Sequence, residues 1–298
     1  RAIDAYTSAT RLDPGYALAW SELAQAWTTF AGQDLGGAPA QQAYVQARAA
    51  VTTALALQPN LAVAHVARGN LLLTADFDWT GAEAEFRRAL QLAPNDGEAM
   101  SNLGYLLATL GQPEQAVALG RQALAADPLN AGRHSWLAIH LSGLGRLNEA
   151  EQAIRKAIEL QPAAVRFHEQ LTIIEIQRGH AKAALAAARQ EPAGVWQGAA
   201  LALAQQIGGD PAAADAALKH LIDKDATGMP YQIAEVYALR RDADHTFAWL
   251  DRAWAARDPG ISLLLTDPFI LRYRDDPRFA AFCRQVGLPT TTEAKAQP

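Results

Sequence analysis

The run GEAMSNLGYLLATLGQPEQAVALGRQALAADPLN, from Gly97 to Asn130, predicts the fold of the chain. Its apolar and small residues keep a helical spacing when Gly97 is numbered 1: Met100 at 4, Leu103 at 7, Gly104 at 8, Leu107 at 11, Ala116 at 20, Ala123 at 27 and Pro128 at 32. Apolar residues three and four positions apart lie on one face of a helix. The run therefore predicts two helices, each of which buries one face.

The ends and the crossing of these two helices can also be located in the run. Gly111 suits the left-handed residue that ends a helix. Pro113 suits the first position of the next helix, where its missing N–H costs nothing, and Pro128 cannot continue a helix interior. Gly104 and Ala116 are small where the helices would cross, so the two backbones can approach closely.

The same unit recurs along the chain. Pro94, Pro128 and Pro162 are each 34 residues apart, Pro59 precedes Pro94 by 35, and Pro14 precedes Pro59 by 45. Insertions of one and eleven residues account for the two longer gaps. A period of this length indicates an array of units in which each unit packs on its neighbours.

These positions resemble the tetratricopeptide repeat (TPR). The sequence departs from the repeat at Leu107, where Tyr is usual, and at Gly120, where Phe is usual. The resemblance implies an all-α fold, a right-handed superhelical α-solenoid of helix-turn-helix repeats. The expected organisation is a half repeat over 1–16 and about seven repeats up to residue 260, then capping helices over 261–289 and a disordered tail over 290–298.

Local signals refine this expectation. The segment from Gly32 to Ala40 is rich in Gly and Pro and predicts a loop between two helices. Polar residues that could cap helix N-termini are expected in three pairs: Thr80 with Glu83, Asn148 with Glu151, and Asp210 with Pro211. Residues Ile261 to Leu288 break the repeat pattern. Asp267-Pro268 and Asp276-Pro277 there predict two short helices that cover the open end of the stack.

Two longer runs resemble a particular group of bacterial proteins. They are FDWTGAEAEFRRAL (Phe77–Leu90) and DPFILRYRDDPRFAAFCRQVGLP (Asp267–Pro289). In that group a TPR array follows a winged-helix DNA-binding domain, a nucleotide-cyclase-like domain or a protein kinase, often through a membrane segment and a TolB-like region. The resemblance implies a role in signalling or transcription regulation. Residues Ala2 to Pro14 fit only the second helix of a unit, so we expect the chain to be a piece of a longer protein.

Composition narrows the possible functions. The net charge of −5 is mild and argues against a nucleic-acid surface on this part of the protein. The single Cys283 excludes an internal disulfide framework and a multi-cysteine metal site. No apolar run approaches the ~18 residues of a membrane span, so no membrane insertion is expected. The compartment, bacterial cytoplasm or periplasm, stays open.

Candidate metal and catalytic motifs are incomplete. His65, His134 and His168 all fall at position 4 of a unit, where a large residue packs between helices. Residues Asp76 to Gly81 copy the first half of an EF-hand loop, but Arg87 stands where the bidentate Glu is needed. Nucleotide-binding and nucleophile motifs are missing from the sequence. We therefore expect no metal, no cofactor and no catalytic residue, and the chain is not predicted to be an enzyme.

The remaining candidate site is the groove that first helices line in stacked repeats, mainly through positions 2, 5, 9 and 12. The predicted groove residues are Gln25, Asn70, Ser101, Asn102, Tyr105, Ser135, Trp136, Ile139 and Glu169. Asn70 and Asn102 match the two asparagines of the carboxylate clamp in chaperone-binding TPR proteins. Val66, Gly132 and Trp136 occupy the positions where that clamp needs cations, which argues against recognition of a terminal carboxylate. The alternative, that both asparagines are merely solvated, stays open.

Two functions fit these observations. The first is a non-catalytic scaffold that binds a protein or peptide in the concave groove. The second is a sensory or regulatory module that acts in cis on a missing N-terminal DNA-binding or signalling-enzyme domain. Copies of the chain could also associate through the exposed helix of the N-terminal half repeat, Ala2 to Leu12.

Overall fold

The structure is a computed structural model that describes residues 1–33 and 38–290. The described residues form helices and connecting turns without a strand, which confirms the predicted all-α solenoid class. Two compact units divide at Leu106 and Leu107, within one helix. The predicted tail over 290–298 lies, apart from its first residue, outside the described residues.

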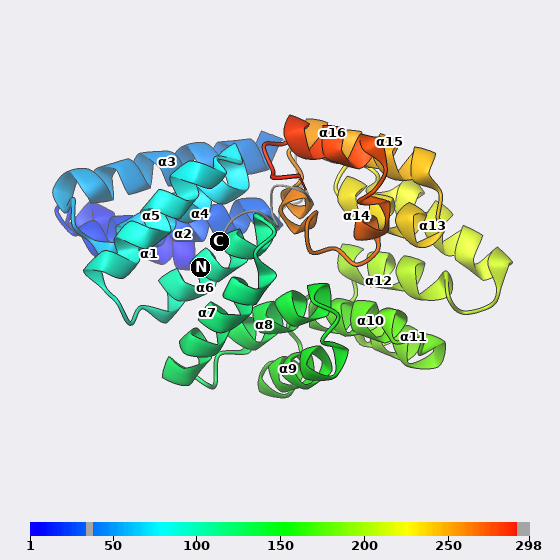
Figure 1. Ribbon diagram of the computed structural model, residues 1–298. Coiled ribbons are helices and arrows are strands. Elements are labelled where there is room, and N and C mark those ends of the chain that lie inside the picture. Colours follow the sequence, from blue (N-terminus) through cyan, green and yellow to red (C-terminus); the bar gives the residue numbers. More distant parts are fainter. Residues whose placement is uncertain (34–37, 291–298) are drawn as a thin grey trace. The chain divides into compact units, whose positions relative to one another are not determined.

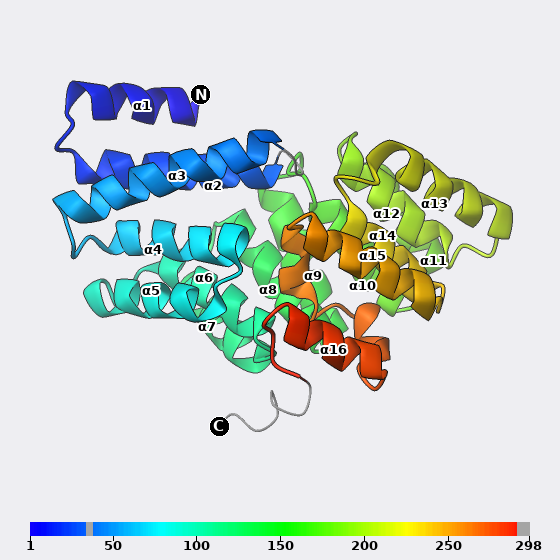
Figure 2. The ribbon, with the colours of Figure 1, turned by 90° about the horizontal axis from the view of Figure 1, so that it is seen from above.

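Unit 1 stacks consecutive helices against one another, and α1 to α5 lie side by side in Figure 2. Its helices are α1 (Ala2–Leu12), α2 (Ala17–Gln33), α3 (Ala38–Leu57), α4 (Ala62–Leu71), the π-helical turn η1 (Leu72–Asp76), α5 (Trp79–Leu92) and the first part of α6 (Gly97–Thr109).

Unit 2 continues the pairing and ends in a segment of short helices (Figure 1). Its elements are α7 (Pro113–Ala126), α8 (Ala131–Gly143), α9 (Leu147–Leu160), α10 (Phe167–Gln177), α11 (Ala181–Gln190), α12 (Val195–Gln205), α13 (Pro211–Asp225), α14 (Pro230–Leu239), α15 (Ala243–Ala255), the 3₁₀ turns η2 (Pro259–Leu263) and η3 (Ile270–Tyr273), and α16 (Pro277–Gln285). The first helices α8, α10, α12 and α14 contact one another in sequence.

Small residues let the paired helices approach closely. Alanines at positions 20 and 27 are completely buried, as at Ala82 and Ala89 in unit 1 and at Ala150 and Ala157 in unit 2. Gly69, at position 8, faces the ring of Phe86, and a Cβ placed there would lie 2.4 Å from Cε1 of that ring. The Phe86 ring on α5 can therefore pack against the α4 backbone at Gly69 only while this residue has no side chain.

Turn residues repeat with the same period. Gly111, Gly145 and Gly179 end successive first helices with φ values of 76°, 71° and 75°, in the left-handed region that glycine favours. The predicted caps at Asp210 and Asp276 are confirmed, because their side chains accept N–H groups of the following turn.

Two other capping predictions are wrong. The helix expected from Thr80 begins at Trp79, and Asp78 accepts the Gly81 N–H. The helix expected from Asn148 begins at Leu147 after Arg146, with no side-chain cap. In the first case Asp78 precedes the helix and competes with Thr80 for the same role.

The loop predicted from Gly32 to Ala40 is wrong at its two ends, where α2 continues to Gln33 and α3 begins at Ala38. The middle of the predicted loop, residues 34–37, lies outside the described residues. The alanines and glutamines that border the predicted loop are good helix formers and favour this outcome.

Position 4 has a role that the periodicity did not reveal. The Trp20 indole N–H donates to the Pro14 carbonyl at 2.9 Å, and Nε2 of His65 and His134 lies 2.9 Å from the carbonyls of Pro59 and Pro128. Each ring thus reaches the proline that closes the preceding unit. Since a carbonyl only accepts, Nε2 is the donor in both contacts. Nδ1 of His65 lies 2.6 Å from a carboxylate oxygen of Glu85. Among the described residues no group of three metal-ligating side chains is placed to hold an ion.

The C-terminal segment folds onto α14 and α15. The ring of Tyr231 packs against Gly260, and Arg272 donates to the carbonyls of Ala238 and Leu239 at the end of α14. Thr266 reaches α8, since a Cβ on Gly143 would lie 2.9 Å from the Thr266 carbonyl oxygen.

The helix predicted to start at Pro268 is wrong. Instead, Asp267 accepts the N–H groups of Phe269 and Ile270 in a tight turn that leads to η3. The role of the segment as a cap stays a prediction.

Two remaining features concern surfaces. Leu12 at the end of α1 is 83% exposed, and the expected association of copies through α1 stays a prediction. No described helix has both the length and the apolar character needed to cross a membrane.

The contact at Gly69 gives a direct test of the packing. Gly69→Ala should lower the free energy of unfolding by about 1–3 kcal/mol, because the new methyl group overlaps the Phe86 ring. Gly120→Ala is the matched control, since its Cβ would lie 3.6 Å from Leu137, an ordinary contact. It should stabilise the helix by about 0.5–1 kcal/mol. Urea unfolding of both variants measures the difference, and equal stabilities would show that α4 and α5 do not meet closely.

Candidate functional site

In unit 1, polar side chains connect three successive first helices. The Gln25 amide on α2 donates to Glu98 on α6, and the Asn70 amide on α4 donates to the Gln25 oxygen at 3.4 Å. The structure therefore brings Gln25 and Asn70 together, as the predicted groove requires. Gln25, Asn70 and Glu98 thus form a row of polar side chains. Because a side-chain amide both donates and accepts, this row can also form hydrogen bonds with a peptide backbone.

The other predicted residues of unit 1 lie on α6. Ser101 donates to the carbonyl of Gly97 in its own helix at 2.7 Å, so its hydroxyl is already satisfied. Asn102 and Tyr105 are half-buried. Among the described residues no hydrogen bond joins Asn102 to Asn70, and the match of this pair to a clamp stays a prediction.

In unit 2, the predicted residues lie at different depths. Ser135 is buried and donates to the Gln170 side chain at 2.6 Å. Trp136 is half-buried and stacks on His140, with ring centroids 6.5 Å apart. Ile139 and Glu169 line the same cavity, which is formed within unit 2. The structure thus brings Ile139 and Glu169 together.

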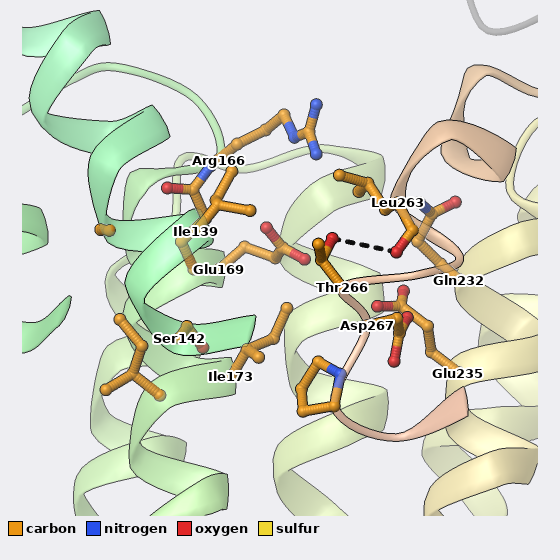
Figure 3. Close-up of a pocket in the computed structure, with 14 residues that line it drawn as sticks. Ile139, Ser142, Arg166, Glu169, Ile173, Gln232, Glu235, Leu263, Thr266 and Asp267 are labelled. Carbon is orange, nitrogen blue, oxygen red and sulfur yellow. Dashed lines mark hydrogen bonds between the residues drawn. The ribbon is translucent and has the colours of Figure 1, made fainter. Parts of the chain in front are cut away.

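This cavity has a volume of about 50 Å³ and lies between α8, α10, α14 and residues 263–268 (Figure 3). Apolar side chains form much of its wall, and carboxyl groups from three elements enter it. The lining residues are Ala138, Ile139, Ser142, Arg166, Glu169, Gln170, Ile173, Ile174, Gln232, Glu235, Leu263, Thr266, Asp267 and Pro268.

Asp267 is buried and well provided with hydrogen-bond donors. Its Oδ2 accepts the Tyr231 hydroxyl at 3.1 Å, and its Oδ1 accepts the N–H groups of Phe269 and Ile270 at 2.8 and 2.9 Å. Glu235 donates a carboxyl proton to Asp267. Burial, followed by the charges of Asp267 and Glu169, holds the pKa of Glu235 well above its usual range. Glu235 is therefore a neutral donor in this network.

Glu169 differs from these two acids. Its backbone N–H donates to Glu191 at 3.0 Å, and the N–H of Arg166 donates to the same carboxylate at 2.5 Å. The Glu191 carboxylate thereby accepts two backbone N–H groups at the start of α10 that have no partner within the helix. The Glu169 side chain is 3% exposed, and its Oε2 has no hydrogen-bond partner. Burial, opposed by the Arg166 charge, raises the pKa of Glu169 to about 7.

Arg166 stands at the edge of the cavity in a constrained conformation. Its φ is 77°, which is unusual for a residue with a Cβ, and its guanidinium lies 4.2 Å from the ring centroid of Trp196. Among the described residues no ion pair joins Arg166 to Glu169, although their charges interact.

Sequence reasoning missed two of the three acids. Glu235 lies at position 9 of the last repeat, so the rule that selected Asn70 would have found it if it had been applied to α14. Asp267 was expected only to cap a helix. Its place beside α10 depends on how the C-terminal segment folds back, which no local pattern indicates.

Family comparison identifies the repeats in the middle of the chain. Residues 85–118 and 107–171 match models of the tetratricopeptide repeat. A curated relative, the small glutamine-rich tetratricopeptide repeat-containing protein 2 of Mycosarcoma maydis, is 31% identical over 97 residues, which are 33% of this chain and 27% of the relative. Residues 85–171 thus match the tetratricopeptide repeat, and the chain aligns with about a quarter of that relative's length.

Solved structures share the fold. The Cut9–Hcn1 hetero-tetramer of APC/C contains a chain that matches with a TM-score of 0.60 and 14% identity, over 95% of this chain and 52% of that one. PilW, a type IV pilus biogenesis factor, matches with a TM-score of 0.56 and 20% identity, over 72% of this chain and 98% of that one. At these identities the likeness shows a TPR-like solenoid and no more.

The buried carboxyl makes a prediction for pH. Between about pH 4, where an unfolded glutamate ionises, and about pH 7, the folded chain keeps a proton on Glu169 that the unfolded chain has lost. The contribution of Glu169 to stability therefore falls as pH rises through this window. Glu169→Gln removes that loss, so it should stabilise the chain by roughly 1–3 kcal/mol at pH 8 and by less at pH 5.

Urea unfolding at both pH values measures this effect. Glu159→Gln, at an exposed glutamate on α9, is the matched control and should change stability little at either pH. A Glu169→Gln variant that shows the same change at pH 5 and pH 8 would mean that Glu169 titrates normally in the folded chain.

Proposed function

We propose that this chain is a non-catalytic scaffold that binds a protein or peptide through the first helices of its repeats. Proteins built from tetratricopeptide repeats are generally protein-interaction scaffolds, and the repeats support this class of function here. The observation that carries the proposal is the row of polar groups from Gln25 through Asn70 and Glu98. Helix packing requires none of these three side chains, since positions 7, 8, 20 and 27 supply the buried contacts.

The two units offer contact residues of different kinds. In unit 1 the row of amides suits a peptide backbone, whose N–H and C=O groups both need partners. In unit 2 the half-buried aromatic ring of Trp136 suits an apolar anchor, because aromatic residues often dominate binding energies. The proposed contact residues are Gln25, Asn70, Ser101, Asn102 and Tyr105 in unit 1, and Ser135, Trp136, Ile139 and Glu169 in unit 2.

Ser135 and Glu169 are buried, so they would act from beneath the contact surface. Ser135 holds the side chain of Gln170, which lines the cavity. Glu169 itself enters the cavity.

A displayed library of random peptides, selected on the full chain, tests the proposal without a known partner. The affinity of each selected peptide is then measured by calorimetry for wild type, for Gln25→Ala with Asn70→Ala, and for Trp136→Ala. We expect at least one of these changes to weaken each peptide by about tenfold, the scale of a lost interface anchor. Gln42→Ala with Gln46→Ala, two exposed amides on α3, is the matched control and should leave affinity unchanged.

Melting temperatures separate binding from folding. Removal of the Gln25 and Asn70 side chains should change the free energy of unfolding by less than about 0.5 kcal/mol, since both sites are polar and incompletely buried. The proposal is overturned if no peptide is selected, or if selected peptides lose affinity only with the α3 variant.

A further inference from the structure

We propose that the cavity of unit 2 binds one lysine side chain of the peptide partner, with the lysine ammonium held by the Glu169 carboxylate. This inference rests on the proposed function and specifies the chemistry of one of its contacts. It goes beyond the sequence prediction, in which Glu169 was one of several groove residues of no stated role.

The starting observation is a buried carboxylate oxygen without a partner. Oε2 of Glu169 makes no hydrogen bond, although the side chain is 97% removed from solvent. Figure 3 shows the Glu169 carboxyl pointing into the space between α10, Thr266 and Asp267. Buried polar groups in proteins nearly always have a partner, and an unsatisfied one costs about 1–3 kcal/mol. A donor supplied by a ligand would satisfy this oxygen.

The neighbouring acids are already engaged in hydrogen bonds, so they do not take this role. Glu191 accepts two backbone N–H groups, Asp267 accepts three donors besides Glu235, and Glu235 is the proton donor in that pair. Arg166 stacks on Trp196, and among the described residues it forms no ion pair with Glu169, although its Nε is buried and also has no hydrogen-bond partner. With Glu235 neutral, ionised Glu169 and Asp267 carry two negative charges, whereas Arg166 carries one positive charge. The cavity therefore favours a cation.

The size and walls of the cavity select among cations. A volume of about 50 Å³ holds the end of one side chain, since a single water needs about 10–15 Å³. Ile139, Ile173 and Leu263 present apolar surface along which the methylene stem of lysine can lie. The compact ammonium carries three donors and can turn toward Glu169, whereas the planar guanidinium of arginine needs a wider, flatter partner.

The protonation of Glu169 gives lysine binding a pH dependence, which a carboxyl with a purely structural role would not produce. The groups facing Glu169 are Arg166 just before α10, Glu191 after α11, Glu235 on α14 and Asp267 in the C-terminal segment. Because burial raises the pKa of Glu169 to about 7, its carboxyl is largely protonated at pH 6 and largely ionised at pH 8. Lysine binding should therefore strengthen as pH rises from 6 to 8.

Peptide selection on the full chain, with removal of peptides that also bind Glu169→Gln, tests the proposal. We expect the remaining peptides to share a lysine. Replacing that lysine by norleucine should weaken binding to wild type by about tenfold or more at pH 8, the scale of a charge-assisted hydrogen bond. The same replacement should have little further effect on Glu169→Gln, and acetylation of the peptide N-terminus should have none.

Three results would overturn the proposal while the proposed function stands. They are equal affinity of the lysine and norleucine peptides for wild type, preference for arginine at that position, and a loss on N-terminal acetylation equal to that on lysine replacement. Glu159→Gln, the exposed counterpart on α9, should bind like wild type. The norleucine comparison leaves the protein unchanged, so it remains decisive even if a protein variant unfolds.

A second probe tests the lysine pocket without the contacts that a peptide makes with the rest of the groove. Nα-acetyl-lysine methylamide is titrated into the full chain while the methyl signals of Ile139 and Ile173 are followed by NMR. We expect saturable shifts with the lysine probe at pH 8, weaker shifts at pH 6, and none with the norleucine analogue. Equal responses to both probes would overturn the lysine pocket, whatever the library selection has shown about the proposed function.

Discussion

Close packing between paired helices, at residues no larger than alanine, is the constraint on which this structure depends. Ala82 and Ala89 in unit 1, and Ala150 and Ala157 in unit 2, have no exposed surface, and Gly69 has no room for a methyl group. Since these contacts are the same in successive pairs, each first helix takes up the same relation to its own partner. Side chains at one repeat position therefore come to lie near their equivalents, as Gln25 and Asn70 do at position 9.

The second constraint is the burial of Asp267 by the C-terminal segment. Three protein donors and the Glu235 proton offset the cost of removing this carboxyl from water. The same fold brings Thr266 against Gly143 and places Asp267 across a small cavity from Glu169. Oε2 of Glu169 has no hydrogen-bond donor. The wall of the cavity therefore carries a carboxyl whose negative charge makes no contact that the fold needs.

Sequence reasoning found what depends on neighbours in the chain. The Gly97–Asn130 run located the turn glycine Gly111, and Asp-Pro pairs located two helix starts at Asp210 and Asp276. It failed where local signals compete, as when Asp78 rather than Thr80 caps α5, and at the two ends of the predicted Gly32–Ala40 loop, where α2 continues to Gln33 and α3 begins at Ala38. The cavity could not be predicted, because it joins α8 and α10 to residues 263–268 through tertiary contacts alone. Among the cavity residues that were missed, Glu235 could have been found, because it lies at position 9 of its repeat.

The central claim is that Glu169 is a buried, unpartnered carboxyl available to a ligand cation. Its side-chain ¹³C signal, assigned by comparison with Glu169→Gln, can be followed by NMR across pH in the full chain. The account predicts a midpoint near pH 7 in the free protein, and a lower midpoint when Nα-acetyl-lysine methylamide is bound. A midpoint near pH 4, the ordinary value for glutamate, or one that the lysine probe leaves unchanged, would contradict it.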